Sequence, residues 1–182
     1  VGFIGSHVTI ALLERNYNVV IADSFLNSSK EFYSRMIGLI NSINPLLKNN
    51  LKLYEGDIRN SNFLEKIFND SKKEDKLIDG VIHLAGLKAV KESVNNPLLY
   101  WDLNLNGAIK LLEAMKKFDC HYLIFSSSAT IYGKHKDKLI NEKSNINPIN
   151  PYGYTKATIE FMLKNLFDSA PNKWRIANLR YF

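Results

Sequence analysis

The sequence predicts an α/β protein with a Rossmann-like, doubly wound parallel sheet that is incomplete at both ends. Over 182 residues, short runs rich in Val, Ile and Leu alternate with longer amphipathic runs, the order that builds βαβ units and a parallel sheet. The short runs are almost continuously apolar, as expected for strands of a sheet covered on both faces. Two glycines, Gly2 and Gly5, stand before the first helical run, as in the phosphate-binding loop of this class of fold.

The expected strands are short apolar runs between helical segments. The first is β-branched and ends at Asp23, and the second is weaker. In chain order the expected strands are 18–22, 51–55, 80–84, 122–125 and 175–179.

The expected helices lie between these strands. In the first, Val8, Ala11 and Leu12 share one face, which is the spacing of an amphipathic helix. The last follows Asn150-Pro151, which reads as an N-cap and a proline at the first helical position. In chain order the expected helices are 6–16, 30–43, 62–69, 97–117 and 151–168. A long polar loop at 133–150 precedes the last helix, and loops of this length are often functional.

The composition is that of an ordinary folded protein, with 46% hydrophobic and 23% charged residues. The single cysteine, Cys120, excludes an internal disulfide and argues against a cysteine-based metal site. No apolar run reaches the ~18 residues of a membrane span. The net charge is +6, but the lysines are mixed with acids and no arginine stripe with interleaved aromatics occurs. We expect a cytoplasmic protein with no metal, no membrane contact and no nucleic-acid partner.

The two ends of the chain predict a piece of a longer protein. Residue 1 is Val, and the opening residues lack the basic and long apolar segments of a signal peptide. The chain closes inside an apolar, strand-like run, whereas natural ends are usually polar and frayed. We expect residues 1–182 to form one partial domain.

The glycine pair and Asp23 together predict a dinucleotide site. Gly2 and Gly5 match the later glycines of a G-x-x-G-x-x-G loop, where the backbone approaches a pyrophosphate and helix amides face the phosphates. Asp23 lies 18 residues after Gly5, at a strand end, where a carboxylate accepts hydrogen bonds from an adenosine ribose. The same charge repels a 2′-phosphate, so NAD is favoured over NADP. The alternative is that Asp23 only caps a turn or helix.

Tyr152 and Lys156 are the predicted catalytic pair. Their i, i+4 spacing places both on one face of a helix, and a nearby ammonium lowers the pKa of a phenol toward neutrality, which makes it a usable base. A second pair with this spacing, Tyr132 and Lys136, lies in a loop after a strand, where the side chains share no fixed face. We therefore favour the helical pair.

Three serines, Ser126, Ser127 and Ser128, end the fourth expected strand. Open α/β sheets bind ligands at the carboxyl ends of their strands, so a hydroxyl here can hydrogen-bond a substrate oxygen beside the tyrosine. Taken alone, the serines fit a polar strand end or turn equally well. The informative feature is the order along the chain: phosphate loop, ribose-binding acid, strand-end serine, then Tyr-x-x-x-Lys.

Six stretches match one known family at the right spacing, at residues 2–7, 55–60, 83–90, 126–133, 151–156 and 179–182. On these stretches the chain resembles the extended short-chain dehydrogenase/reductase family and, within it, the UDP-sugar 4-epimerases. Related sugar-nucleotide dehydratases carry an Asp-Glu pair just after the strand-end serine or threonine. Here Ala129 and Thr130 follow Ser128, so the dehydratase acids are missing.

The resemblance implies a resident NAD and a UDP-sugar substrate. Tyr152 would be the general base for the sugar 4-hydroxyl, Lys156 would lower its pKa and hold the nicotinamide ribose, and Ser128 would hydrogen-bond the 4-oxygen. The implied cofactor-binding residues are Gly2, Phe3, Ile4, Gly5, Asp23, Asn27, Ser28, Asp57, Ile58, Leu84, Ala85, Gly86, Lys88, Asn104, Tyr152 and Lys156. The implied substrate-binding residues are Lys88, Ser128, Ala129, Thr130, Tyr152, Tyr181 and Phe182. No metal site is implied.

The implied reaction, a step of galactose metabolism, interconverts UDP-glucose and UDP-galactose by transient oxidation and re-reduction at C4. Compared with the family, the sequence lacks the first strand, the first glycine of the loop and the C-terminal domain that holds most uridine contacts. We therefore expect the chain alone to have no measurable epimerase activity and weak NAD affinity. The alternatives are another NAD-dependent sugar-nucleotide epimerase or decarboxylase, or a non-catalytic NAD-binding module. The full-length protein is expected to be a homodimer through the helices at 97–117 and 151–168.

Overall fold

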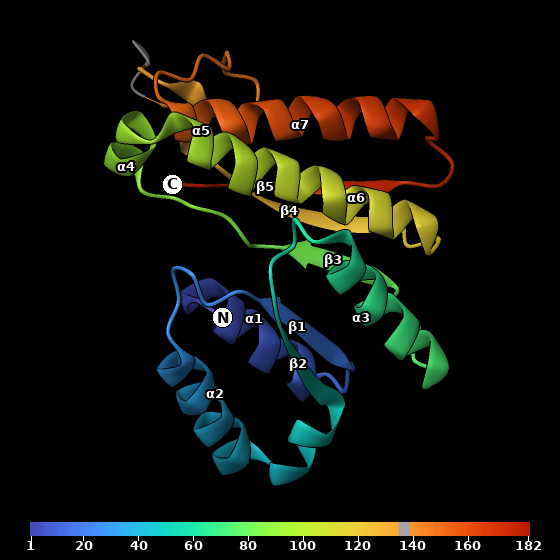
Figure 1. Ribbon diagram of the computed structural model, residues 1–182. Coiled ribbons are helices and arrows are strands. Elements are labelled where there is room, and N and C mark those ends of the chain that lie inside the picture. The colour runs from blue at the N-terminus through green and yellow to red at the C-terminus, as the bar shows by residue number, and fades with distance from the viewer. Residues whose placement is uncertain (135–138) are drawn as a thin grey trace. The chain divides into compact units, whose positions relative to one another are not determined.

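The computed structural model describes residues 1–134 and 139–182, and the predicted α/β fold with parallel strands is confirmed (Figure 1). The chain divides into two units, Val1–Leu77 and Ile78–Phe182. The described strands form two parallel sheets, one in each unit. Lys136, half of the rejected Tyr-x-x-x-Lys pair, and part of the predicted loop at 133–150 lie outside the described residues.

The first unit is a two-stranded parallel sheet with helices. Its elements are α1 (Phe3–Glu14), β1 (Val19–Asp23), α2 (Lys30–Ile43), the 3-10 helix η1 (Pro45–Asn50), β2 (Leu51–Glu55) and α3 (Ser61–Lys73). Strand β1 pairs with β2 so that Asp23 lies beside Glu55 at the carboxyl edge. Leu13 of α1 packs with Met36 and Ile40 of α2 in the core of this unit. Burial of such apolar side chains is the main force that holds a helix on a sheet.

The second unit is a three-stranded parallel sheet in the order β3-β4-β5. Its strands are β3 (Gly80–His83), β4 (Tyr122–Ser128) and β5 (Arg175–Tyr181). Its helices are α4 (Val90–Asn95), α5 (Pro97–Tyr100), the π-helical turn η2 (Trp101–Asn106), α6 (Gly107–Lys117), the 3-10 helix η3 (Ala129–Tyr132) and α7 (Pro151–Ser169).

Helices α6 and α7 cover one face of this sheet (Figure 1). Leu123 and Phe125 of β4 are buried on that face, whereas Tyr122 and Ile124 point to the opposite face and are exposed. Within the second unit, the described helices therefore cover one face of β4, and cover on both faces stays a prediction. A continuous apolar run cannot distinguish the two cases, since successive side chains alternate between faces whatever covers them.

The helix predicted at 97–117 is interrupted by the π turn at Trp101–Asn106. Single π turns inside α-helices are often found at functional sites. None of the helices in the described parts of the chain combines the length and the apolarity of a transmembrane span.

Candidate active site

Helix α7 begins where the sequence predicts. The Asn150 side chain accepts a hydrogen bond from the Gly153 N–H at 2.8 Å, which makes Asn150 the N-cap. A Cβ at position 153 would lie 2.8 Å from the Thr130 carbonyl oxygen, so only glycine lets the first turn of α7 approach η3 this closely. The cap and the glycine together seat the start of α7 against the residues that follow β4.

Tyr152 and Ser128 meet at the carboxyl end of β4. The Ser128 hydroxyl oxygen accepts hydrogen bonds from the Thr130 N–H (3.2 Å) and the Thr130 hydroxyl (3.0 Å). Its own proton is therefore left to be donated, and hydrogen bonding from Ser128 acts to lower the pKa of Tyr152. The Tyr152 ring is buried and packs edge-on against Tyr100, with 6.4 Å between centroids. The predicted serine ends β4 and the predicted tyrosine lies in the first turn of α7, and their catalytic roles stay predictions.

The electrostatics of Tyr152 differ from the prediction. Burial raises its pKa, and the hydrogen bond from Ser128 offsets part of that rise. Lys156 lies with Nζ 5.9 Å from the Tyr152 ring centroid and donates a hydrogen bond to the Ser126 carbonyl oxygen at 2.7 Å. The expected lowering of the phenol pKa by the ammonium is therefore not present in this structure, because desolvation of the phenolate dominates.

Lys156 is itself a perturbed group. The side chain is buried with its Nζ 4.8 Å from the centroid of the Phe125 ring. Burial lowers the pKa of Lys156 to about 8. Among its hydrogen bonds to described residues, the one to Ser126 uses a single N–H, so two donors of the ammonium remain for a ligand.

Asn104 joins the segment after β3 to helix α7. Its amide donates to the Leu87 carbonyl oxygen and the Thr155 hydroxyl, both at 3.1 Å, and its Oδ1 accepts from the Leu87 N–H at 2.8 Å. Gly86 has φ of +149°, and a Cβ there would lie 2.9 Å from Asn104 Oδ1 and 3.9 Å from Lys156 Nζ. The structure therefore brings together Gly86, Asn104 and Lys156, three residues expected at the cofactor, so closely that a Cβ at position 86 would overlap Asn104.

The remaining predicted residues of the second unit lie at the same carboxyl edge. Tyr181 of β5 is the register partner of Ser128, and Phe182 follows it with its side chain exposed. Of the other predicted residues, three follow β3 and one follows β4: Leu84, Ala85 and Lys88, and Ala129.

In the first unit, Asp23 closes the turn after β1. Its Oδ1 accepts hydrogen bonds from the Phe25 N–H at 2.8 Å and the Ser28 hydroxyl at 3.2 Å, and its other oxygen contacts the Val1 amino group. The structure thus brings together the predicted pair Asp23 and Ser28, with Asn27 beside them in sequence. The Asp23 carboxylate closes the turn here, which was the alternative interpretation of this residue. Binding of a ribose would use the same carboxylate.

Asp57, after β2, is held by Arg59. The Asp57 carboxylate accepts from Arg59 Nε at 3.0 and 3.1 Å, from Nη2 at 2.5 Å and from the Arg59 N–H at 2.8 Å. These hydrogen bonds lower the pKa of Asp57. The neighbouring Ile58 is half-buried.

The predicted phosphate loop stands at the start of α1. Gly2 is the N-cap residue, and no side chain among the described residues caps this helix end. A Cβ at Gly2 would meet no atom within 4 Å, so packing inside the chain does not require glycine there, whereas close approach of a ligand to the backbone does. The other predicted residues here, all in the first turn of α1, are Phe3, Ile4 and Gly5.

Sequence reasoning missed Glu160. Its buried carboxylate accepts a hydrogen bond from Ser127 Oγ at 2.5 Å and pairs with the Arg180 guanidinium. The available signal was its position four residues after Lys156, on the same helix face. Its partner Arg180 lies 20 residues away and could not be found from local spacing.

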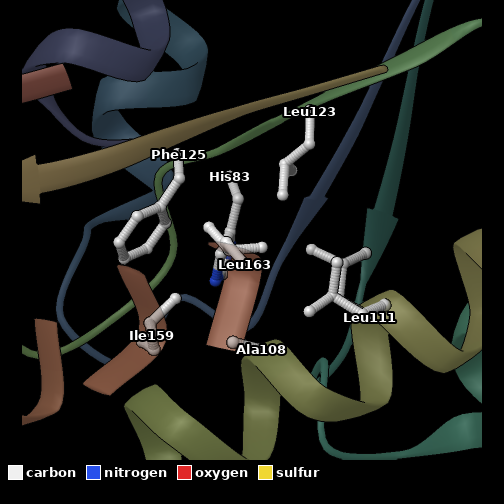
Figure 2. Close-up of a pocket in the computed structure, with 8 residues that line it drawn as sticks. His83, Ala108, Leu111, Leu123, Phe125, Ile159 and Leu163 are labelled. Atoms are coloured by element: carbon white, nitrogen blue, oxygen red, sulfur yellow. The ribbon is translucent and has the colours of Figure 1, made fainter. Parts of the chain in front are cut away.

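His83 is a packed strand residue, as predicted. Figure 2 shows its ring among Leu111, Leu123, Phe125 and Ile159, in a pocket with no room for a water molecule. Its Nε2 has no hydrogen-bond partner among the described residues, and burial together with the charge of Lys156 lowers its pKa to about 3. The ring is therefore neutral. The described residues contain no cluster of three or more His, Cys, Asp or Glu that could hold a metal ion.

A parallel α/β fold with a Tyr-x-x-x-Lys pair and a strand-end serine is typical of extended short-chain dehydrogenases/reductases. The chain belongs to the family described as GDP-mannose 4,6 dehydratase, whose model matches residues 1–182.

Within this family the similar proteins are epimerases. The chain is 44% identical over 181 residues to a bifunctional UDP-glucose 4-epimerase and UDP-xylose 4-epimerase of Pisum sativum, and 43% identical to a UDP-glucose 4-epimerase of Arabidopsis thaliana. It covers 49% of each of these relatives. A UDP-glucose 4-epimerase from Bifidobacterium longum, solved with NAD+ and UDP, matches with a TM-score of 0.88 at 40% identity, over 100% of this chain and 50% of that chain. The chain thus spans about half the length of the relatives it matches.

Proposed function

We propose that this chain is the NAD-binding part of a UDP-glucose 4-epimerase. The observation that carries the proposal is the arrangement on α7, where buried Tyr152 and buried Lys156 lie one helical turn apart and Lys156 donates to the Ser126 carbonyl oxygen of the strand that ends at Ser128. Ala129 and Thr130 follow Ser128, so the acid pair expected of a dehydratase is missing. Support also comes from the relatives, which are named as UDP-glucose 4-epimerases at 40–44% identity.

The residues of each unit fit NAD. In Val1–Leu77, the open backbone at Gly2 suits a pyrophosphate, and the Asp23 carboxylate with Ser28 suits a ribose diol. In Ile78–Phe182, the space beside Gly86 is lined by Asn104 and by Lys156, whose ammonium has donors to spare. When bound, NAD would accept a hydride from C4 of the sugar and return it to the opposite face.

The chain's own residues would manage the proton. Tyr152 takes the proton of the sugar 4-hydroxyl as the C4–H bond is broken, and returns it to the 4-oxygen when that bond re-forms. Ser128 donates a hydrogen bond to the 4-oxygen or to the Tyr152 oxygen, and Thr130 holds the Ser128 oxygen in place. Tyr152 would act as a base in its phenolate form, and Lys156 would hold the cofactor through its two remaining N–H donors. Because the same atoms leave and return, the net reaction is an isomerisation.

The broader expectations belong to this proposal. The full-length protein would be a cytoplasmic homodimer, and residues 1–182 would be its partial dinucleotide-binding domain. Leu98 of α5 and Phe161 of α7 expose 81% and 59% of their surfaces, which supports a role for these helices in an interface. The chain alone would show no measurable epimerase activity and weak NAD affinity.

The test is conversion of UDP-galactose to UDP-glucose by the full-length gene product that contains residues 1–182, with no NAD added. We expect turnover, and a loss of about 100-fold or more in kcat for Tyr152→Phe, because general-base catalysis contributes about 10²–10⁴-fold. Tyr154→Phe is the matched control, since Tyr154 lies on the same helix and is half exposed.

A product panel separates the alternatives. Carbon dioxide release would indicate a decarboxylase, and turnover of a different UDP-sugar would indicate a different epimerase. Tightly bound NAD without turnover of any UDP-sugar would refute the proposed activity and favour a non-catalytic module.

A further inference from the structure

Glu160 is the centre of a buried ionic network. Its Oε1 accepts from Ser127 Oγ at 2.5 Å and from Arg180 Nε at 3.0 Å, and its Oε2 accepts from Arg180 Nη2 at 2.6 Å. Arg180 Nη1 donates to the Tyr132 hydroxyl at 2.7 Å and to the Glu142 carbonyl oxygen at 3.2 Å. The carboxylate therefore links helix α7 to strand β4 directly, and to strand β5 and helix η3 through the guanidinium.

The link to β4 continues a series of side-chain contacts along α7. Tyr152, Lys156 and Glu160 lie at i, i+4 and i+8, one helical turn apart on one face. Tyr152 contacts Ser128, Lys156 contacts the carbonyl of Ser126, and Glu160 contacts the hydroxyl of Ser127. Three successive turns of α7 are thus each attached to one of three successive serines of β4.

Stability alone does not account for this network. Burial of an ion pair is weak evidence for stabilisation, because the desolvation of two charges offsets their attraction, and apolar replacements of both partners are often neutral or stabilising. The directional hydrogen bonds from the rigid, bidentate guanidinium of Arg180 instead fix the position of Glu160, and with it helix α7, relative to β5.

Arg180 also keeps the carboxylate away from Lys156. An ammonium and a carboxylate four residues apart on a helix commonly pair. In the described residues, however, the ion pair of Glu160 is with Arg180, and Lys156 donates to Ser126. Glu160 can therefore hold the helix without neutralising the ammonium that the reaction uses.

We propose that Glu160 is a positioning residue, which fixes helix α7 lengthwise on strand β4 through Ser127 and Arg180 and so holds Tyr152 against Ser128. An effect of Glu160 on kcat rests on the proposed epimerase function, whereas its effect on the position of Tyr152 does not.

The decisive variant is the double replacement Glu160→Met with Arg180→Met in the full-length gene product. It leaves the net charge unchanged and keeps the site filled with apolar atoms. The matched control is Lys110→Gln with Glu113→Gln, a surface pair on α6 at 2.9 Å. We expect the unfolding midpoint of the double variant to stay near that of the wild type, while kcat falls about 10- to 100-fold, because small misplacements of a reacting group cost about this much. KM for the UDP-sugar should stay within about twofold.

A second measurement needs no turnover. The pKa of Tyr152 is followed by NMR of ring-labelled tyrosine, with Tyr152→Phe in the same background to assign the signal. Loss of the hydrogen bonding from Ser128 should raise this pKa, because that bonding favours the phenolate. Ser127→Ala keeps the ion pair and removes the direct link to β4, so it should change kcat and the Tyr152 pKa in the same directions even if the double variant does not fold.

The outcomes separate the two proposals. A wild-type kcat and an unshifted Tyr152 pKa in folded variants would overturn the positioning role. If the wild type turns over no UDP-sugar, the epimerase proposal fails, and the Tyr152 titration then decides the positioning role by itself.

Discussion

Replacing Gly86 by alanine tests the geometry of the site without any ligand. Gly86 has φ of +149°, a conformation that residues with a Cβ rarely adopt, and the added Cβ would lie 2.9 Å from Asn104 Oδ1. Asn104 cannot yield easily, since its amide makes three buried hydrogen bonds, two to the Leu87 backbone and one to Thr155. Either the backbone or Asn104 must therefore move.

The free-energy cost follows from these two contributions. A non-glycine residue in such a backbone conformation costs about 1–3 kcal/mol. Displacement of Asn104 that breaks one or two buried hydrogen bonds costs about 1 kcal/mol for each. We expect Gly86→Ala to lower the free energy of unfolding of the second unit by about 2–5 kcal/mol, and its Tm by about 10–25 °C.

The assay is urea unfolding followed by tryptophan fluorescence. Both tryptophans, Trp101 and Trp174, lie in the second unit, so the signal reports the unit that carries Gly86. Gly38→Ala is the control, followed by far-UV circular dichroism. Gly38 lies inside α2 with no atom within 4 Å of an added Cβ, so alanine there should stabilise by about 0.5–1 kcal/mol. A Gly86→Ala unfolding free energy within about 0.5 kcal/mol of the wild type would refute the reasoning.

Three further predictions concern single side chains. The folded pKa of Lys156 is about 8 against an ordinary 10.5, so the unfolded chain binds more protons between these values and stability rises with pH through that window. Lys156→Met should therefore stabilise the chain at pH 7 by at most about 3 kcal/mol, an advantage that shrinks above pH 8; a pH-independent difference in urea midpoints would contradict this. Asn150→Ala removes the cap of α7 and should cost about 1 kcal/mol in the same unfolding assay, whereas no change would mean that the cap is dispensable. Cys120 is buried and its pKa is raised to about 11, so iodoacetamide at pH 7.5 should modify it in urea and not in buffer; labelling of the native chain, seen by mass spectrometry, would show that the site opens.

Amphipathic periodicity and capping residues correctly predicted the long helices. The helix predicted at 30–43 is α2 with the same bounds, and Asn150 caps α7 as expected. Local rules succeed here because an amphipathic stripe and a cap depend only on neighbours within a few residues.

The short elements and the long-range contacts were missed. Helices α4, η1 and η3 are too short to show a periodic pattern, and β4 extends through its serines because pairing with β5 outweighs the weak strand preference of Ser. The Glu160 network joins residues that are 20 and 33 positions apart, a distance at which sequence spacing carries no information.

Tyr132 shows how a spacing motif can mislead. It belongs to a second Tyr-x-x-x-Lys sequence, yet its ring is buried and its hydroxyl accepts a hydrogen bond from Arg180. The helix context that separated the two pairs was therefore a better guide than the motif itself.

The π turn at Trp101–Asn106 interrupts the regular α-helical spacing of the run from Pro97 to Lys117, so residues before and after it do not follow one repeat of about 3.6 residues. A π turn accommodates one residue more than an α turn, and each residue of an α-helix corresponds to a rotation of about 100°. Because the turn absorbs the extra residue within one rotation, deleting one residue from it would restore a uniform helix and leave α6 with its present face toward the sheet. A deletion inside α6 itself would instead rotate the residues beyond it by about 100°, so changes in length should be tolerated at the π turn and not within α6.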